Sequence, residues 1–203
     1  MKNKLPAFCA LILLLLATIG CSMANKLVNE YDKSQPPKVL SSDDGKTQIS
    51  VPSSWTVDKE LNTAANIQAS NRLGEQYVVV ISESKASFGQ KIDFDYVTKF
   101  IQDDMLKKMT NGQILGQTDA TVGGFPAKLF EATGEISNVK VKYLYALVNA
   151  PQNFHQIITW TLQDRYDDNK SKLQDVINSF KDNDDSSTGE PPAPANIKSK
   201  RSK

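Results

Sequence analysis

The chain has 203 residues, of which 39% are hydrophobic and 23% charged, and its formal net charge at pH 7 is +1. This composition is typical of a globular protein, and the length suffices for one domain with a sizeable core. The near-neutral charge excludes the strong positive field that steers proteins to nucleic acid, so no nucleic-acid partner is expected.

The N-terminus carries the most informative pattern of the chain. Lys2 and Lys4 precede an apolar run, Ala7–Ile19, that ends just before Cys21. A basic start, a short apolar stretch and a small residue at the cleavage point are typical of a secretory signal. The run has about 13 residues, whereas a membrane-spanning helix needs roughly 20. Residues 1–20 are therefore predicted to be a signal peptide.

The residues around the cleavage point resemble the box at which bacterial lipoproteins are cut and acylated, Thr18-Ile19-Gly20-Cys21. Cys9 lies inside the apolar run, so Cys21 would be the only cysteine of the exported protein. Two or more acyl chains anchor a protein stably without a spanning helix. We predict that acylated Cys21 binds membrane lipid and places the protein on the extracytoplasmic side of the cell membrane or the outer membrane. The alternative is an ordinary secretory signal with a cysteine nearby.

Two polar segments frame the predicted domain. Residues 21–38 have no sustained hydrophobic period and end in Gln35-Pro36-Pro37-Lys38, which is typical of a flexible tether. Residues 181–203 are mostly Asp, Ser, Pro and Lys and cannot bury enough apolar surface to order themselves, so a disordered tail is predicted. Residues 39–180 are left as a single domain.

The first part of the domain predicts two hairpins. Short strands are expected at Val39–Ser42 and Thr47–Val51, around an Asp-Asp-Gly turn, and at Asn66–Ser70 and Glu75–Ser82. The run from Tyr77 to Ile81 is apolar throughout, which is typical of a strand that is covered on both faces.

A helix is predicted from Asp93 to Met109. Asp93 is a suitable N-cap, and Asp95 complements the positive end of the helix dipole. Asn111-Gly112 is expected to end the helix. Apolar residues recur every three to four positions and predict one buried stripe: Phe94, Val97, Ile101 and Met105.

The second half of the domain predicts four strands and a closing helix over Tyr166–Phe180. The strands are expected at Gly116–Val122, Ala127–Glu135, Val139–Val148 and Phe154–Leu162. Short turns join successive strands, which favours antiparallel pairing. The order of elements therefore predicts an α+β domain with a mostly antiparallel sheet of about six to eight strands flanked by helices.

Three stretches, in this order, resemble the PsbP-like domains, a family that includes bacterial DcrB-type lipoproteins. Gln48–Trp55 is similar to the opening strand, proline and tryptophan of the family, and Gly123–Ala127 to its mid-domain turn. Val176–Phe180 is similar to its closing helix, which often ends in Ser-Phe. The resemblance implies an α/β/α sandwich and an accessory or binding role at a membrane. It implies no catalytic motif and no cofactor.

The sequence contains one histidine, His155, and most catalytic or metal-site hypotheses would need it. A metal site would need further ligands beside it, and a nucleophilic triad would have to use it. No Gly-x-Ser-x-Gly motif precedes it. We therefore expect a surface or half-buried histidine on the outer face of the sheet, with a ligand or acid–base role as the alternative. We predict no enzyme and no metal site.

Two places are candidates for ligand binding. Trp55, beside a proline loop, is either a core residue or a surface on which a ligand stacks. Asp164, Asp167 and Asp168 lie where the N-cap and the first-turn acids of the last helix are expected, and a cation site is the alternative.

These observations together predict an envelope lipoprotein with a non-catalytic domain. The domain is expected to be an accessory or binding module for a protein partner at the membrane. The alternative is a carrier lipoprotein for a small ligand or a cation, using Trp55 or the three aspartates.

Overall fold

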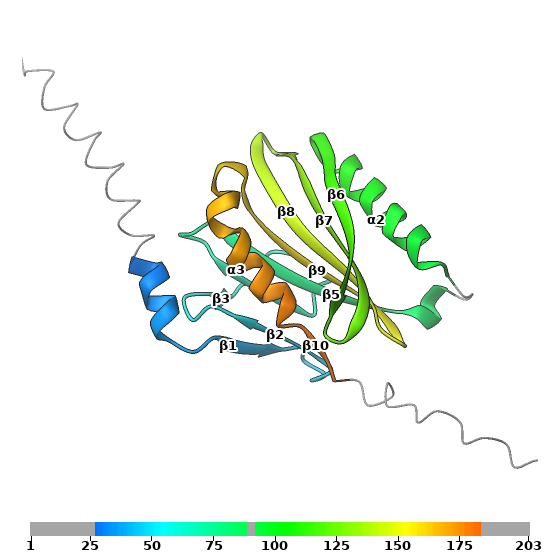
Figure 1. The fold of residues 1–203 in the computed structure, drawn as a ribbon, viewed down its shortest axis with the longest axis horizontal. Coiled ribbons are helices and arrows are strands. Elements are labelled where there is room, and N and C mark those ends of the chain that lie inside the picture. The colour runs from blue at the N-terminus through cyan, green and yellow to red at the C-terminus, as the bar shows by residue number, and fades with distance from the viewer. Residues whose placement is uncertain (1–26, 89–91, 184–203) are drawn as a thin grey trace, which may run out of the picture.

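The structure, a computed structural model, describes residues 27–88 and 92–183 (Figure 1). A seven-stranded sheet lies at the centre, with helices on both faces and a three-stranded sheet beside it. This α+β architecture confirms the predicted fold class. The predicted signal peptide, Cys21 and residues 184–203 of the predicted tail lie outside the described residues.

The large sheet is antiparallel throughout, with the strand order β3-β4-β5-β9-β8-β7-β6. Its strands are β3 (Thr56–Val57), β4 (Ile67–Asn71), β5 (Gln76–Ser84), β6 (Thr110–Val122), β7 (Phe125–Ile136), β8 (Val139–Asn149) and β9 (Asn153–Leu162). The small sheet has the order β1-β2-β10. Its strands are β1 (Lys38–Ser41), β2 (Thr47–Val51) and β10 (Lys181–Asp182).

Short turns explain why neighbours in the sequence pair in the sheet. Gly123 and Gly124 join β6 to β7 with φ angles of 61° and 88°. A two-residue hairpin turn of this hand needs positive φ at both positions, which glycine adopts without steric cost. Ser137 and Asn138 make the same kind of connection between β7 and β8, with φ angles of 51° and 65°.

One face of the large sheet, which we call the packed face, is covered by α3 (Tyr166–Asn178) and by the small sheet. The closing helix is present as predicted, and its apolar side chains are buried in the main core. That core includes, from several elements, Ile49, Trp55, Val80, Ala146, Ile157, Leu173, Ile177 and Phe180.

The other face, which we call the open face, carries α2 (Phe94–Lys107). Asp93 is its N-cap, as predicted, and accepts a hydrogen bond from the backbone N of Tyr96 at 2.9 Å. The predicted stripe packs on a second, smaller cluster formed by Val97, Phe130, Tyr145, Leu147 and Phe154. Strand side chains alternate between the faces, so neighbouring residues of β8 serve the two clusters in turn.

The structure differs from the sequence expectations at both ends of the domain. Residues 27–34, in the segment expected to be a flexible tether, are helical. Lys181–Asp182, at the start of the expected tail, form β10 and pair with β2. Both segments are held by partners distant in the sequence, which local composition does not reveal.

The boundary after α2 also differs. The helix ends with Lys108 as C-cap, in the right-handed helical conformation. Asn111 and Gly112, expected to stop the helix, belong instead to the irregular start of β6, where the pairing with β7 shifts register. Asn111 has a φ of 53°, which fits such an irregularity.

Candidate functional site

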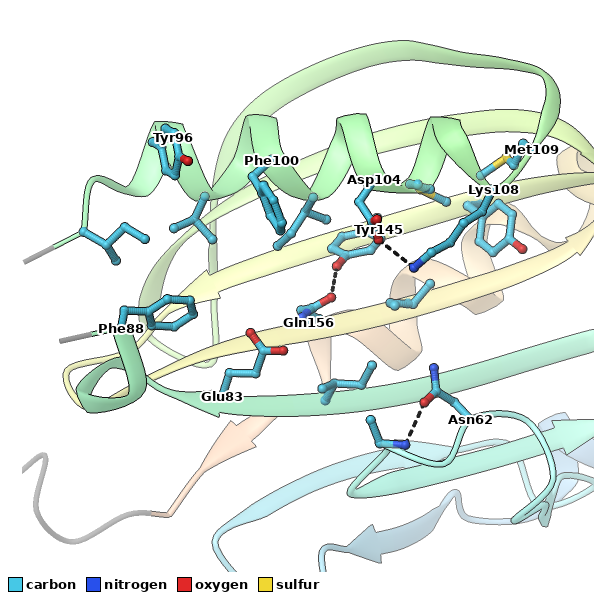
Figure 2. A pocket seen from close by; sticks show the side chains of 18 of the residues that line it. Asn62, Glu83, Phe88, Tyr96, Phe100, Asp104, Lys108, Met109, Tyr145 and Gln156 are labelled. Atoms are coloured by element: carbon cyan, nitrogen blue, oxygen red, sulfur yellow. Dashed lines mark hydrogen bonds and ion pairs between the residues drawn. The ribbon is translucent and has the colours of Figure 1, made fainter. Parts of the chain in front are cut away.

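A cavity of about 670 Å³ lies on the open face, between α2 and the strands β5, β8 and β9 (Figure 2). We call it the groove. Ile81, Tyr143, Tyr145 and Ile158 line it on the sheet side. On the helix side it is lined by apolar residues of α2 and, at the rim, by two charged ones: Tyr96, Val97, Phe100, Ile101, Asp104, Met105 and Lys108.

The groove exists because one helix covers only part of the sheet. The N-terminal end of α2 is fixed by Phe94, which stacks on Phe154 with ring centroids 6.0 Å apart, and Phe88 meets the same ring edge-on. Tyr96 and Phe100 lie outside the buried stripe and are exposed. Figure 2 shows Phe100 projecting from α2 toward the sheet, with Glu83 rising from β5 across the groove.

The few polar groups of the groove are placed at its floor and rim. The Tyr145 hydroxyl donates a hydrogen bond to Gln156 Oε1 on the floor (Figure 2). Burial, and to a lesser degree the charges of Glu83 and Asp104, raises the pKa of Tyr145 well above its usual value of 10. Its hydroxyl therefore stays protonated and donating. At the rim Lys108 Nζ and Asp104 Oδ2 form an ion pair of 2.6 Å.

An aromatic ledge continues the floor of the groove along the open face. Tyr77 stacks on Trp160 with centroids 5.1 Å apart, and Tyr143 lies against the same indole at 5.8 Å. Burial raises the pKa of Tyr143 to about 12. All three rings are half-buried, so the ledge adds apolar surface without closing the face.

The predicted position of His155 on the outer face of the sheet is wrong. Its side chain is only 1% exposed and lies on the packed face, and is not the expected surface or half-buried group. Nδ1 lies 2.9 Å from Ser82 Oγ, and Nε2 lies 3.1 Å from Asp182 Oδ2. The burial follows from β10, which brings Asp182 against the sheet and encloses the imidazole together with Phe180.

Ser82, His155 and Asp182 are the residue types of a hydrolytic triad, but their arrangement is different. In the triad Nε2 faces the serine and Nδ1 the aspartate, and here the two nitrogens are exchanged. These three residues line neither the groove nor a second cavity, of about 410 Å³, that lies between α3 and the strands β6, β7 and β8. The cluster pairs buried polar groups and ties β10 to β5 and β9, which is a structural role.

Trp55 belongs to the core of the packed face and not to a ligand-stacking surface. It is fully buried, and its Nε1 donates a hydrogen bond of 3.1 Å to Gln76 Oε1. Gln76 in turn donates to Asn169 Oδ1 of α3 at 2.5 Å. The tryptophan therefore ties the loop after β2 to the sheet and to the last helix.

The three aspartates near the last helix are exposed. Asp167 and Asp168 occupy the first turn of α3, as predicted. There they complement the helix dipole. Asp164 is not the expected N-cap, because it lies in the short helix η2 (Gln163–Arg165) and Arg165 occupies the N-cap position of α3. Among the described residues, no group of three or more His, Cys, Asp or Glu side chains is arranged to hold a metal ion.

The groove was not predicted from the sequence, because the apolar stripe of α2 reports only on the buried side of that helix. Tyr96 and Phe100 are two aromatic residues four positions apart, outside the predicted stripe of their helix. Residues at this spacing lie on one side of a helix. A pair of large aromatic side chains on a side that should face water is the signal that pointed to this surface.

Within residues 27–88 and 92–183, no helix has the length and apolar character needed to cross a membrane.

Comparisons with known proteins bear on the fold. No protein-family model matches the chain, and no curated protein matches it in sequence. The solution structure of cyanobacterial PsbP (CyanoP) from Synechocystis sp. PCC 6803 is similar, with a TM-score of 0.53 and 14% identity over 72% of this chain and 92% of that one.

Two further structures are similar at the same level. LpqN of Mycobacterium tuberculosis, described as involved in cell envelope biogenesis, has a TM-score of 0.54 and 16% identity, covering 75% of this chain and 95% of that one. A protein of Bacteroides thetaiotaomicron VPI-5482 has a TM-score of 0.53 and 7% identity, and the match covers 75% of this chain and 50% of that one. At these identities the likeness concerns the fold alone. The chain therefore has the α+β fold found in PsbP, as the three stretches of its sequence implied.

Proposed function

We propose that this chain is a membrane-anchored envelope lipoprotein with a non-catalytic binding domain, and that the groove between α2 and the sheet is its binding site. The observation that carries the proposal is the groove itself, about 670 Å³ of mostly apolar space between α2 and the sheet. The signal sequence and Cys21 support the anchor.

The chemistry of the groove suits binding. Its walls are apolar and aromatic, its polar groups are few, and four of them bind each other in two pairs, Tyr145 with Gln156 and Asp104 with Lys108. Sites of this kind gain affinity from burial of apolar surface, and a small number of polar groups fix orientation. Exposed aromatic side chains such as Phe100 are enriched where proteins bind one another.

The occupant that we favour is an apolar segment of a protein at the membrane. An accessory role of this kind fits the resemblance to PsbP-like domains, and the description of LpqN as an envelope-biogenesis protein supports the envelope as the compartment. The partner would cover Tyr96 and Phe100, which are otherwise large aromatic groups facing solvent.

A small ligand is the second candidate, favoured by the size of the groove. Its volume of about 670 Å³ lies inside the range of roughly 300–1,000 Å³ that is typical of small-molecule sites. In that case the amide of Gln156 and the hydroxyl of Tyr145 would orient the polar end of the ligand at the floor.

The experiment compares Phe100→Glu with a matched control, Val57→Glu. The two side chains are similarly exposed, 59% and 56%, but only Phe100 lines the groove. Tagged proteins are captured from crosslinked membranes. We expect a recurrent partner with the natural chain and the control, and its loss with Phe100→Glu. A partner that survives Phe100→Glu contradicts the groove as its site.

A thermal-shift panel of apolar and amphipathic compounds tests the second candidate. A ligand that binds the folded state raises the stability by RT ln(1 + [L]/Kd), and Phe100→Glu should abolish the shift. A flat response over the panel would remove the carrier hypothesis. Mass spectrometry of the mature N-terminus tests the anchor separately, since acylation of Cys21 adds the mass of its fatty chains.

A further inference from the structure

The helix formed by residues 27–34 is attached to the domain by specific polar contacts. Asp32 Oδ1 accepts a hydrogen bond of 2.9 Å from the backbone N of Ser54, and Oδ2 accepts one of 3.0 Å from its hydroxyl. Lys172 of α3 pairs with Asp32 at 3.1 Å and donates to Asn29 at 2.8 Å. The side chain of Asp32 is 8% exposed, so these contacts are shielded and fix the helix on the domain.

The outward side of this helix is apolar. Leu27 and Tyr31 lie four positions apart, on one side of the helix, and are 66% and 53% exposed. The charged residues Glu30 and Lys33 flank them and are also exposed. Because the opposite side of the helix is docked on the domain, these two side chains leave its outer side available for a second contact.

A third exposed apolar residue lies at the same end of the domain. The turn between β4 and β5 is linked to the helix through Asn71, whose Nδ2 donates to the Ser54 hydroxyl that also binds Asp32. Leu73, at the tip of this turn, is 86% exposed. Figure 1 shows the helix and the start of β5 toward one end of the molecule and α2 toward the other.

The covalent chain limits how far this end can lie from an anchor at Cys21. Only five residues lie between Cys21 and Leu27, so six steps of an extended chain, at most about 3.3–3.6 Å each, span about 20 Å in total. Because the helix is fixed on the domain, an anchored Cys21 restrains the whole domain and not only a loose arm.

We propose that this end of the domain, with Leu27, Tyr31 and Leu73, rests on the lipid bilayer, so that the groove under α2 opens away from the membrane. The inference rests on the proposed acylation of Cys21. The chemistry fits a lipid surface, since tyrosine favours the membrane interface, leucine gains by burial at the acyl boundary, and Lys33 suits anionic headgroups. The consequence for function is that the groove takes its occupant from the aqueous side.

The test uses the full-length acylated protein with one added thiol. Cys9 leaves with the signal and Cys21 is blocked by acylation, so Leu73→Cys or Phe100→Cys supplies a single reactive cysteine for a fluorescent probe. Each labelled protein is placed in phosphatidylethanolamine and phosphatidylglycerol vesicles that contain a spin-labelled quencher lipid. We expect strong quenching at position 73 and fluorescence at position 100 close to that in quencher-free vesicles.

Several results would overturn the proposal. Equal quenching at both positions, or stronger quenching at 100, contradicts the orientation while leaving the anchor intact. A probe at 73 that is shielded from water but not quenched would indicate a protein at this end, and would also contradict it. A protein with an unmodified Cys21 that fails to sediment with the vesicles overturns the proposed anchor together with this inference.

A substitution in the helix tests, by the same quenching measurement, whether Tyr31 contributes to the contact with lipid. Tyr31→Glu should weaken quenching of the probe at position 73, because a carboxylate on the helix opposes contact with lipid. Leu115→Glu on β6 is the matched control, since Leu115 is 48% exposed but lies outside the proposed contact. Equal quenching in the two variants would contradict a contribution from Tyr31.

Discussion

The two faces of the seven-stranded sheet are built differently. The packed face is covered by α3 and by a second sheet, and its large side chains, such as Trp55 and Phe180, are fully buried. The open face carries a single helix and leaves a groove of about 670 Å³. The difference indicates that the two faces have different roles: the packed face supplies most of the stability, and the open face is available for binding.

The polar groups of the two faces also differ in burial. On the packed face they are buried and paired, as in the chain from Trp55 through Gln76 to Asn169. On the open face the ion pair of Asp104 and Lys108 lies at an exposed rim. Buried polar groups are costly unless they are satisfied, whereas exposed pairs contribute little to stability. Substitutions on the two faces should therefore have very different effects.

The largest effect is expected for Trp55→Ala on the packed face. Removal of a fully buried indole leaves a cavity and breaks the hydrogen bond to Gln76. The free energy of unfolding should fall by about 3–5 kcal/mol. Urea denaturation measures it. A loss no larger than that from a surface substitution would contradict the assignment of the main core to this face.

The next effect is expected for His155→Ala. The change leaves Ser82 and the buried Asp182 without the imidazole between them, and should lower the free energy of unfolding by about 1–3 kcal/mol. Lys140→Ala on the neighbouring strand β8 is the control, because the side chain of Lys140 is exposed. If the control cost as much as His155→Ala, the structural role of the cluster would be wrong.

Asp58, after the edge strand β3, gives a pH-dependent effect. Hydrogen bonds from Arg72, and then from Ser70, lower the pKa of Asp58 to about 2. A lowered pKa in the folded state stabilises the protein above the unfolded value near 4, and this stabilisation is lost as the pH falls toward 2.

Asp58→Asn should therefore lower the stability at pH 7 by about 1 kcal/mol, a modest effect because Arg72 is largely exposed. The difference between the natural protein and the variant should shrink between pH 4 and pH 2. Denaturation curves at several pH values measure it, and a difference that is constant over this window would contradict the ion pair.

The smallest effect on stability is expected for Phe100→Ala on the open face. The ring is largely exposed, so the free energy of unfolding should change by no more than about 0.5 kcal/mol. Loss of a captured partner or ligand in the same variant would separate binding from folding. A destabilisation as large as that of Trp55→Ala would show that Phe100 is a core residue instead.

Much of the fold could be predicted from the sequence because its signals are local. Asp93 marks the start of α2, and Gly123-Gly124 marks the hairpin between β6 and β7. Period-two apolar patterns located the strands to within a few residues, with the exception of the two-residue strands β3 and β10 and the early start of β6. Strands as short as two residues carry no periodicity.

The site could not be predicted in the same way, because it depends on contacts between distant segments. His155 is buried by Asp182, which reaches it through β10. Asp32 is held by Ser54 and Lys172, which are 22 and 140 residues away in the sequence. The groove arises from the position of α2 over the sheet, and the local pair Tyr96 and Phe100 indicates an exposed aromatic surface but not that position.

The most direct test of the central claim replaces Phe100 with a photo-crosslinking amino acid in living cells, with Val57 replaced in the same way as the reference. The two positions are similarly exposed, and only the first lines the groove. The account predicts a discrete crosslinked product from position 100 and none from position 57. The same product from both positions, or a product from position 57 alone, would contradict the groove as the binding site.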